Sequence, residues 1–127
     1  MERPPRVLLV EDDRFLRRAA HATLKQKGYD VVLAADGEEA LALARSSAPD
    51  LILLDLMLPR MNGFAVLSAL KQEDATRSIP VIVLSNLGQE SDLQGAMQAG
   101  AVAYYVKANL SLADLVARVE TVLAERT

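Results

Sequence analysis

Short apolar runs alternate with stretches of helical periodicity along this chain, and this alternation constrains the fold more than any other feature. The expected strands cover 7–10, 30–34, 51–54, 81–84 and 102–106. The expected helices cover 13–27, 37–46, a segment that ends near 73, 89–98 and 112–125. Strict alternation with short connections predicts a parallel sheet with helices on both faces. We therefore expect a single α/β domain over residues 1–127.

The composition of the expected strands predicts their order. Strands 7–10, 51–54 and 81–84 are continuous apolar runs, which is typical of strands covered on both faces. Strands 30–34 and 102–106 include polar or small residues, which favours the edges of the sheet. The order 2-1-3-4-5 places the apolar strands in the middle and predicts a flavodoxin-like (βα)5 three-layer sandwich.

Bulk composition excludes several classes of site. The chain has no cysteine and one histidine, His21, which excludes a disulfide framework, a cysteine zinc site, a thiol nucleophile and a histidine cluster. The net charge of −3 gives no sign of direct nucleic-acid binding. The start "MERPPR" lacks the apolar core of a signal peptide, and no apolar run approaches the ~20 residues that span a bilayer. We expect a soluble cytoplasmic domain without membrane contact.

Charged and hydroxyl side chains follow four of the expected strands. Glu11, Asp12 and Asp13 come after the first strand, and Asp55 comes after the third. The fourth strand is followed by Ser85 and the fifth by Lys107. Parallel strands end at one edge of a sheet, where ligands bind, so these groups are expected to converge there.

The converging groups predict a cation and a phosphoryl group. Carboxylates on strands about 5 Å apart repel one another unless a cation lies among them. All the ligands are oxygens, so the cation should be hard; Mg²⁺ is the best candidate and Mn²⁺ is a second one. A lysine and a hydroxyl group at the same edge suit a phosphoryl group.

Four segments carry a resemblance to a known family. They are "LLVEDD" (8–13), "DLILLDLMLPRMNGF" (50–64), "IPVIVLSN" (79–86) and "GAVAYYVKA" (100–108). In order and spacing they resemble the receiver domain of bacterial two-component response regulators, including chemotaxis regulators. The resemblance covers essentially all 127 residues.

The resemblance implies a metal site and a phosphorylation site. Asp55 corresponds to the phosphoacceptor that forms an aspartyl phosphate. Asp12 corresponds to a direct metal ligand and Glu11 to one that acts through water. Met57 stands where the family offers a backbone carbonyl to the metal. Asp13 lies one place beyond the acidic pair and is expected to cap the first helix.

The resemblance also implies a switch. Lys107 corresponds to the lysine that pairs with the phosphoryl group, Ser85 to the hydroxyl that reorients toward it, and Tyr104 to the aromatic switch residue. The donor would be a sensor histidine kinase or a histidine phosphotransfer protein. The helix at 89–98, the fifth strand and the last helix would form the face that contacts a partner or output domain, or a second copy after phosphorylation. Such a domain catalyses only its own phosphorylation and dephosphorylation in a phosphorelay.

Three other functions compete with this interpretation. An aspartate-nucleophile phosphatase of the haloacid-dehalogenase type needs Asp-x-Asp, but the sequence at 55–57 is Asp-Leu-Met. A flavodoxin-like cofactor binder needs a phosphate-cradling first loop, and "EDDR" would repel phosphate. A pseudo-receiver would bind partners without phosphorylation, and the intact set of acids and lysine argues against it.

Some residues have a simpler expectation. Ala108 follows Lys107 where most receivers have a cis proline, and the cost of a cis bond before alanine predicts trans. Arg14, Arg17 and Arg18 are expected to form a solvated helix face. For Phe15 core packing is the default, and the alternative is a partly exposed side chain that contacts the kinase or phosphotransfer protein. The helix at 89–98 contains Gly95, which weakens it.

Overall fold

A computed structural model of the chain describes residues 3–86 and 90–126. Five parallel strands form one sheet in the order β2-β1-β3-β4-β5, as the sequence predicts. The strands are β1 Arg6–Val10, β2 Asp30–Ala34, β3 Leu51–Asp55, β4 Val81–Ser85 and β5 Ala103–Val106. The helices are α1 Arg14–Gln26, α2 Gly37–Ser47, α3 Gly63–Gln72, α4 Glu90–Gln98 and α5 Leu112–Arg126, with a 3₁₀ turn, η1, at Lys107–Asn109. The first position of the helix predicted at 89–98 lies outside the described residues.

Side-chain caps set where the helices begin. The carboxylate of Asp13 accepts a hydrogen bond from the amide three residues later, so the expected cap of α1 is confirmed. At α2 the side chain of Asp36 accepts from the amide of Glu39, and the side chain of Glu39 accepts from the amide of Ala35, so the two form a variant of a capping box. Ser111 and Asp114 form a second capping box at α5. Because α1 is capped at Asp13, only a short turn separates it from β1.

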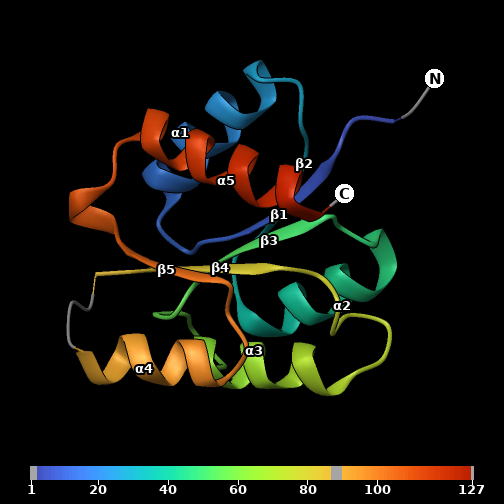
Figure 1. The fold of residues 1–127 in the computed structure, drawn as a ribbon, viewed down its shortest axis with the longest axis vertical. Coiled ribbons are helices and arrows are strands. Elements are labelled where there is room, and N and C mark those ends of the chain that lie inside the picture. The colour runs from blue at the N-terminus through green and yellow to red at the C-terminus, as the bar shows by residue number, and fades with distance from the viewer. Residues whose placement is uncertain (1–2, 87–89, 127) are drawn as a thin grey trace.

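Helices cover the two faces of the sheet unequally (Figure 1). Helices α1 and α5 lie on one face, and α2, α3 and α4 lie on the other. The side chains of β1 alternate between two apolar cores: Val7 and Leu9 face α1 and α5, whereas Leu8 and Val10 face the other layer. The strands β1, β3 and β4 are almost completely buried, and the edge strands β2 and β5 are largely half-buried.

Helices α3 and α4 cover the same face but are held to different extents. Helix α3 buries Val66, Leu67 and Leu70. Helix α4 buries Ala96 alone, while Leu93 is 41% exposed and Met97 is 43% exposed. Little apolar surface therefore anchors α4. None of the helices in the described part of the chain is long and apolar enough to cross a membrane.

Candidate functional site

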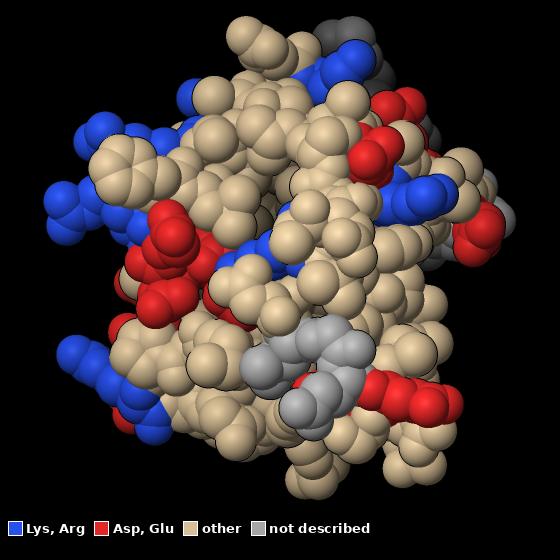
Figure 2. All heavy atoms as spheres, turned by 90° about the vertical axis from the view of Figure 1, so that its left-hand side faces the viewer, with Lys and Arg blue, Asp and Glu red and all other residues tan. Residues whose placement is uncertain are grey.

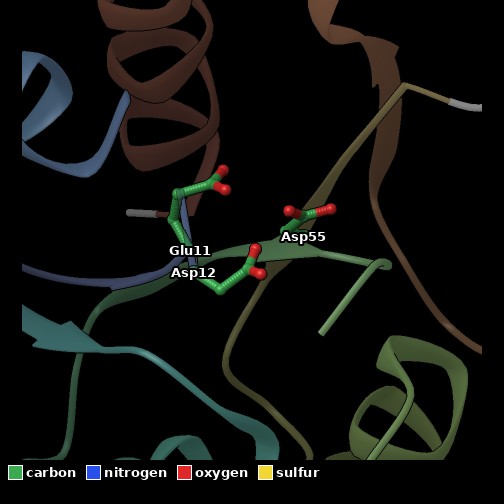
Figure 3. Close-up of side chains that lie close together, drawn as sticks. All are labelled: Glu11, Asp12 and Asp55. Atoms are coloured by element: carbon green, nitrogen blue, oxygen red, sulfur yellow. The ribbon is translucent and has the colours of Figure 1, made fainter. Parts of the chain in front are cut away.

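Two neighbouring strands bring three carboxylates together at the carboxyl edge, which is the edge of the sheet where the parallel strands end. Val10 of β1 pairs with Leu54 of β3, so the next residue along each chain segment, Glu11 or Asp55, lies beside the other at this edge. One carboxylate oxygen from each of Glu11, Asp12 and Asp55 lies within 4.8 Å of the others. Figure 3 shows the three carboxylates grouped around one common space.

The three acids differ in burial. Glu11 is 1% exposed and Asp55 is 2% exposed, whereas Asp12 faces solvent. Asp55 is the last residue of β3, rather than the residue after the strand as the sequence predicts, because its backbone pairs with Leu84 of β4. The strand therefore extends one residue further and holds this carboxylate inside the protein.

Lys107 links two of the acids. It starts η1 directly after β5, and its Nζ lies 2.7 Å from Glu11 Oε1 and 2.7 Å from Asp55 Oδ2. Burial by itself lowers the pKa of Lys107, but hydrogen bonds and charge attraction from the two carboxylates outweigh it and raise the pKa. The Lys107–Ala108 peptide bond is trans, as predicted.

One lysine does not neutralise three acids. Burial raises the pKa of Glu11 to about 7; the hydrogen bond from Lys107 lowers it, and repulsion from Asp55 adds to the rise. Glu11 is thus poised to hold a proton near neutral pH, and an additional positive charge at the site would favour its ionised form.

Backbone amides hold the two buried acids in position. The amide of Met57 donates to Asp55 Oδ1 at 3.0 Å, and the amide of Asp13 donates to Glu11 Oε2 at 3.1 Å. Each of the two carboxylates therefore has a backbone donor on one oxygen and Lys107 on the other. Their directions are fixed before any ligand binds, which lowers the cost of ligand binding.

The donor set fits a hard divalent cation. The candidate ligands are carboxylate oxygens from Glu11, Asp12 and Asp55, without a nitrogen or sulfur ligand in the group. Two of them are buried and mutually repulsive, so a bound cation would replace repulsion with attraction. Met57 lies two residues after Asp55 in the chain, and its side chain is exposed.

The predicted switch residues lie on the two strands beyond Asp55. Ser85 ends β4 and is completely buried. Tyr104 on β5 is half-buried and packs against the core shared with α2, α3 and α4. Ser85 pairs with Val106 of the neighbouring strand, and Lys107 is the next residue after Val106. The sheet therefore places the hydroxyl and the ammonium group at the same edge.

The surface around the site is strongly charged. Figure 2 shows acidic side chains gathered at the carboxyl edge, with basic side chains above and below them.

Phe15 lies near the start of α1 and is 84% exposed, so the expectation that it packs in the core is wrong. Its position on α1 lies away from the buried Ala20 and Leu24, which explains the exposure.

Two residues with roles at this edge were missed by sequence reasoning. Arg17 is half-buried rather than part of a solvated face, and its Nη1 donates to the carbonyl of Glu11 at 2.9 Å. Its spacing of three and seven residues from Ala20 and Leu24 is the signal that places it beside the buried face. Gly63 packs so closely that a Cβ would lie 2.4 Å from the Cα of Leu56.

Comparison with known families agrees with this geometry. Residues 7–120 match the family described as the response regulator receiver domain. The chain belongs to this family. As a receiver domain, it shares its fold with the chemotaxis response regulator CheY4 of Vibrio cholerae, with a TM-score of 0.87 and 30% identity over 94% of this chain and 98% of that one.

Curated relatives of this receiver domain are longer proteins. It is 40% identical over 119 residues to the DNA-binding dual master transcriptional regulator RpaA of Synechocystis, which covers 94% of this chain and 49% of RpaA. It is also 40% identical over 122 residues to the transcriptional regulatory protein PrrA of Mycobacterium tuberculosis, covering 96% of this chain and 51% of PrrA. The chain thus spans about half the length of these relatives.

A metal-bound relative has also been solved. The Mn²⁺-bound form of the response regulator Rcp1 matches with a TM-score of 0.76 and 32% identity, covering 82% of this chain and 81% of that one. The receiver domain described here has an acidic group able to hold a cation of this kind.

Proposed function

We propose that this receiver domain is a phosphoacceptor switch of a two-component phosphorelay in the cytoplasm, and that Asp55 accepts the phosphoryl group. The observation that carries the proposal is the convergence of Glu11, Asp12, Asp55 and Lys107 at the carboxyl edge. Membership of the receiver family supports it. The donor is the phosphohistidine of a sensor histidine kinase or of a phosphotransfer protein.

The transfer needs little covalent chemistry from the protein. An oxygen of the Asp55 carboxylate attacks phosphorus as the nitrogen–phosphorus bond of the donor breaks, and the imidazole leaves with that electron pair and regains a proton. Positioning and charge neutralisation supply the catalysis. The amide of Met57 and the ammonium of Lys107 hold the attacking carboxylate in one orientation. Lys107 then pairs with the phosphoryl oxygens.

Glu11, Asp12 and Asp55 would hold Mg²⁺, with the backbone carbonyl of Met57 as a further ligand, and Mn²⁺ would substitute for it. When bound, the ion supplies positive charge for the phosphoryl oxygens. The Mn²⁺-bound relative Rcp1 supports a divalent cation in this family. Glu11 would take part in holding the ion in its ionised form, so the fraction of Glu11 that is protonated at neutral pH would lose its proton on binding.

The phosphorylated aspartate changes the charge at the end of β3. The aspartyl phosphate adds negative charge and acceptor oxygens, and the hydroxyl of Ser85 reorients to donate to one of them. Tyr104 then turns inward, which shifts the face formed by α4, β5 and α5. That face controls a partner or an output domain. Because curated relatives are transcriptional regulators, control of gene expression through such a domain is the proposed response.

Labelling with acetyl phosphate tests the central step. Wild type should gain one phosphoryl group by intact mass spectrometry only when Mg²⁺ is present, and Asp55→Asn should gain none. Asp74→Asn is the matched control, because Asp74 is an exposed acid that pairs with Arg77 after α3, and this variant should label like wild type. Labelling of Asp55→Asn at the wild-type rate would contradict the assignment, and a folded wild type that takes no phosphoryl group would favour a pseudo-receiver.

Native-state hydrogen exchange tests the moving part of the switch. Amides of α4 should exchange faster than those of α5, because α4 buries only Ala96 of its described residues and contains Gly95. Slower exchange in α4 than in α5 would contradict its role as the most easily displaced helix.

A further inference from the structure

We propose that Arg17 is a positioning residue for the metal and phosphoryl site. By holding the carbonyl of Glu11, it fixes the turn that carries Glu11 and Asp12 toward Asp55. This inference rests on the proposed function, because it concerns how that site is kept ready for its cation.

The backbone of Glu11 is held from two directions. Its amide donates to the carbonyl of Ala34 in the edge strand β2 at 3.0 Å, and its carbonyl accepts from Arg17 Nη1 at 2.9 Å. These bonds fix the peptide planes on both sides of Glu11 at the point where the chain leaves the sheet. The side chain of the next residue, Asp12, is exposed to solvent. The fixed backbone at Glu11 therefore sets the direction in which Asp12 leaves the chain.

The side chain of Arg17 joins α1 to this turn. The backbone amide of Arg17 also donates to the carbonyl of Asp13 at 2.9 Å, as part of the first helical turn. The guanidinium reaches back past Asp13 and Asp12 to the carbonyl of Glu11. The first turn of α1 and the end of β1 are therefore tied together by one half-buried, charge-assisted hydrogen bond. Outer partners of this kind orient the ligands that touch a metal.

Arg14 and Arg18 provide matched controls on the same helix. All three arginines lie within the first turns of α1 and carry the same charge, but Arg14 and Arg18 are exposed and Arg17 is half-buried. Loss of any of these positive charges near the acids should by itself strengthen the binding of a cation. Loss of positioning should weaken it. Charge and positioning thus predict effects of opposite sign.

The test measures Mg²⁺ binding without a phosphodonor, by calorimetric titration of wild type, Arg17→Ala, Arg14→Ala and Arg18→Ala. We expect the dissociation constant of Arg17→Ala to rise about 10-fold, at the low end of the effect of outer partners of metal ligands. The dissociation constants of Arg14→Ala and Arg18→Ala should stay unchanged or fall. Arg17→Lys should recover part of the affinity, because an ammonium group can donate to the same carbonyl without the rigid fork of arginine.

A second measurement needs no metal. The amide of Asp13, which donates to the carboxylate of Glu11, should exchange with solvent faster in Arg17→Ala than in wild type, and at the wild-type rate in Arg14→Ala and Arg18→Ala. The free energy of unfolding is measured alongside. A purely structural role of Arg17 would lower this free energy and leave the Mg²⁺ dissociation constant of the folded protein unchanged.

The outcomes separate the two proposals. If Arg17→Ala binds Mg²⁺ as Arg14→Ala does, the positioning role is overturned. If Arg17→Ala does not fold, Arg17→Lys and Arg17→Gln are compared instead, and equal affinity of both with wild type overturns it. If wild type itself binds no Mg²⁺, the proposed function fails, and the exchange of the Asp13 amide alone then decides whether Arg17 holds the turn.

Discussion

The two ends of the sheet treat charge in opposite ways. At the amino ends of the strands, Arg6 Nε pairs with Asp30 at 2.7 Å, and Asp50 accepts from the amide of Arg6 and from Arg3. Two cations face two anions, and all four side chains are at least partly exposed. Each such pair contributes little to stability, and the charges at this end need no additional ion to balance them.

At the carboxyl edge, anions outnumber cations inside the protein. Glu11 and Asp55 are buried around Lys107, with Asp12 close by. Once Glu11 is ionised, folding therefore leaves negative charge that the chain does not balance, and this imbalance costs stability. The charges of the chain thus balance one another at the amino end. They do not balance at the carboxyl edge, where a cation is expected to bind.

The largest difference between the two ends should appear when one cation is removed from each. Lys107→Met leaves two buried carboxylates without a charged partner and should cost about 3–5 kcal/mol of unfolding free energy at pH 8. Arg6→Ala should cost about 1 kcal/mol, because its partners remain hydrated. Urea unfolding measures both, and equal losses would remove the distinction between the two ends.

A pH titration of stability should show the same contrast in wild type. The folded protein without metal holds the Glu11 proton up to a pKa of about 7, against an ordinary value of 4.5. Because the folded state binds this proton more tightly than the unfolded state, the unfolding free energy should fall as pH rises from about 4.5 to 7 and stay low above that. The loss amounts to a few kcal/mol, since each pKa unit corresponds to about 1.4 kcal/mol.

Glu11→Gln is the variant that isolates this effect. It keeps an acceptor for Lys107 but has no proton to lose, so it should flatten the pH dependence and be more stable than wild type at pH 8. Asp50→Asn at the amino end should keep the wild-type pH dependence between pH 4.5 and 7. A Glu11→Gln variant with the full wild-type slope would assign the titration to another group.

Addition of a cation should reduce the contrast between the ends. Mg²⁺ at about 100 times its dissociation constant should stabilise wild type by about 2.7 kcal/mol. The gain should be smaller in Glu11→Gln and absent in Asp55→Asn, and Arg6→Ala should gain as much as wild type. Thermal unfolding with and without MgCl₂ provides the measurement; stabilisation of Asp55→Asn equal to that of wild type would indicate a different binding site.

The smallest predicted effect concerns backbone strain, which is similar at both ends. Ala48 has φ 47° after α2 at the amino end, and Arg60 has φ 69° in the loop after β3. Glycine adopts this left-handed conformation without the cost that a side chain adds. Ala48→Gly and Arg60→Gly should each raise the unfolding free energy by about 1 kcal/mol. A gain at one end alone would show that the two ends also differ in backbone strain.

Much of the fold followed from local patterns in the sequence. The alternation of apolar runs gave the order of the elements, and the polar residues in β2 and β5 identified the edges. Caps such as Asp13 and Asp36 were readable because they act within three residues. The convergence of Asp55 and Lys107 was predictable from parallel topology alone.

Other features depended on contacts that no local pattern describes. The bridge of Lys107 to both Glu11 and Asp55 depends on how far η1 reaches over the sheet. The bond of Arg17 to a backbone carbonyl depends on a side-chain rotamer. The packing of Gly63 against β3 depends on the close approach of α3 to that strand.

The small apolar surface that α4 buries has a consequence for how a signal passes through the domain. Displacing this helix breaks few apolar contacts, so the free energy of a single charge-assisted hydrogen bond, about 1.5–3 kcal/mol, is comparable to the cost. A partner that covers Leu93 and Met97 in only one position of α4 stabilises that position by its own binding free energy. By reciprocity, such a partner would favour acquisition of the phosphoryl group as much as the phosphoryl group favours the partner.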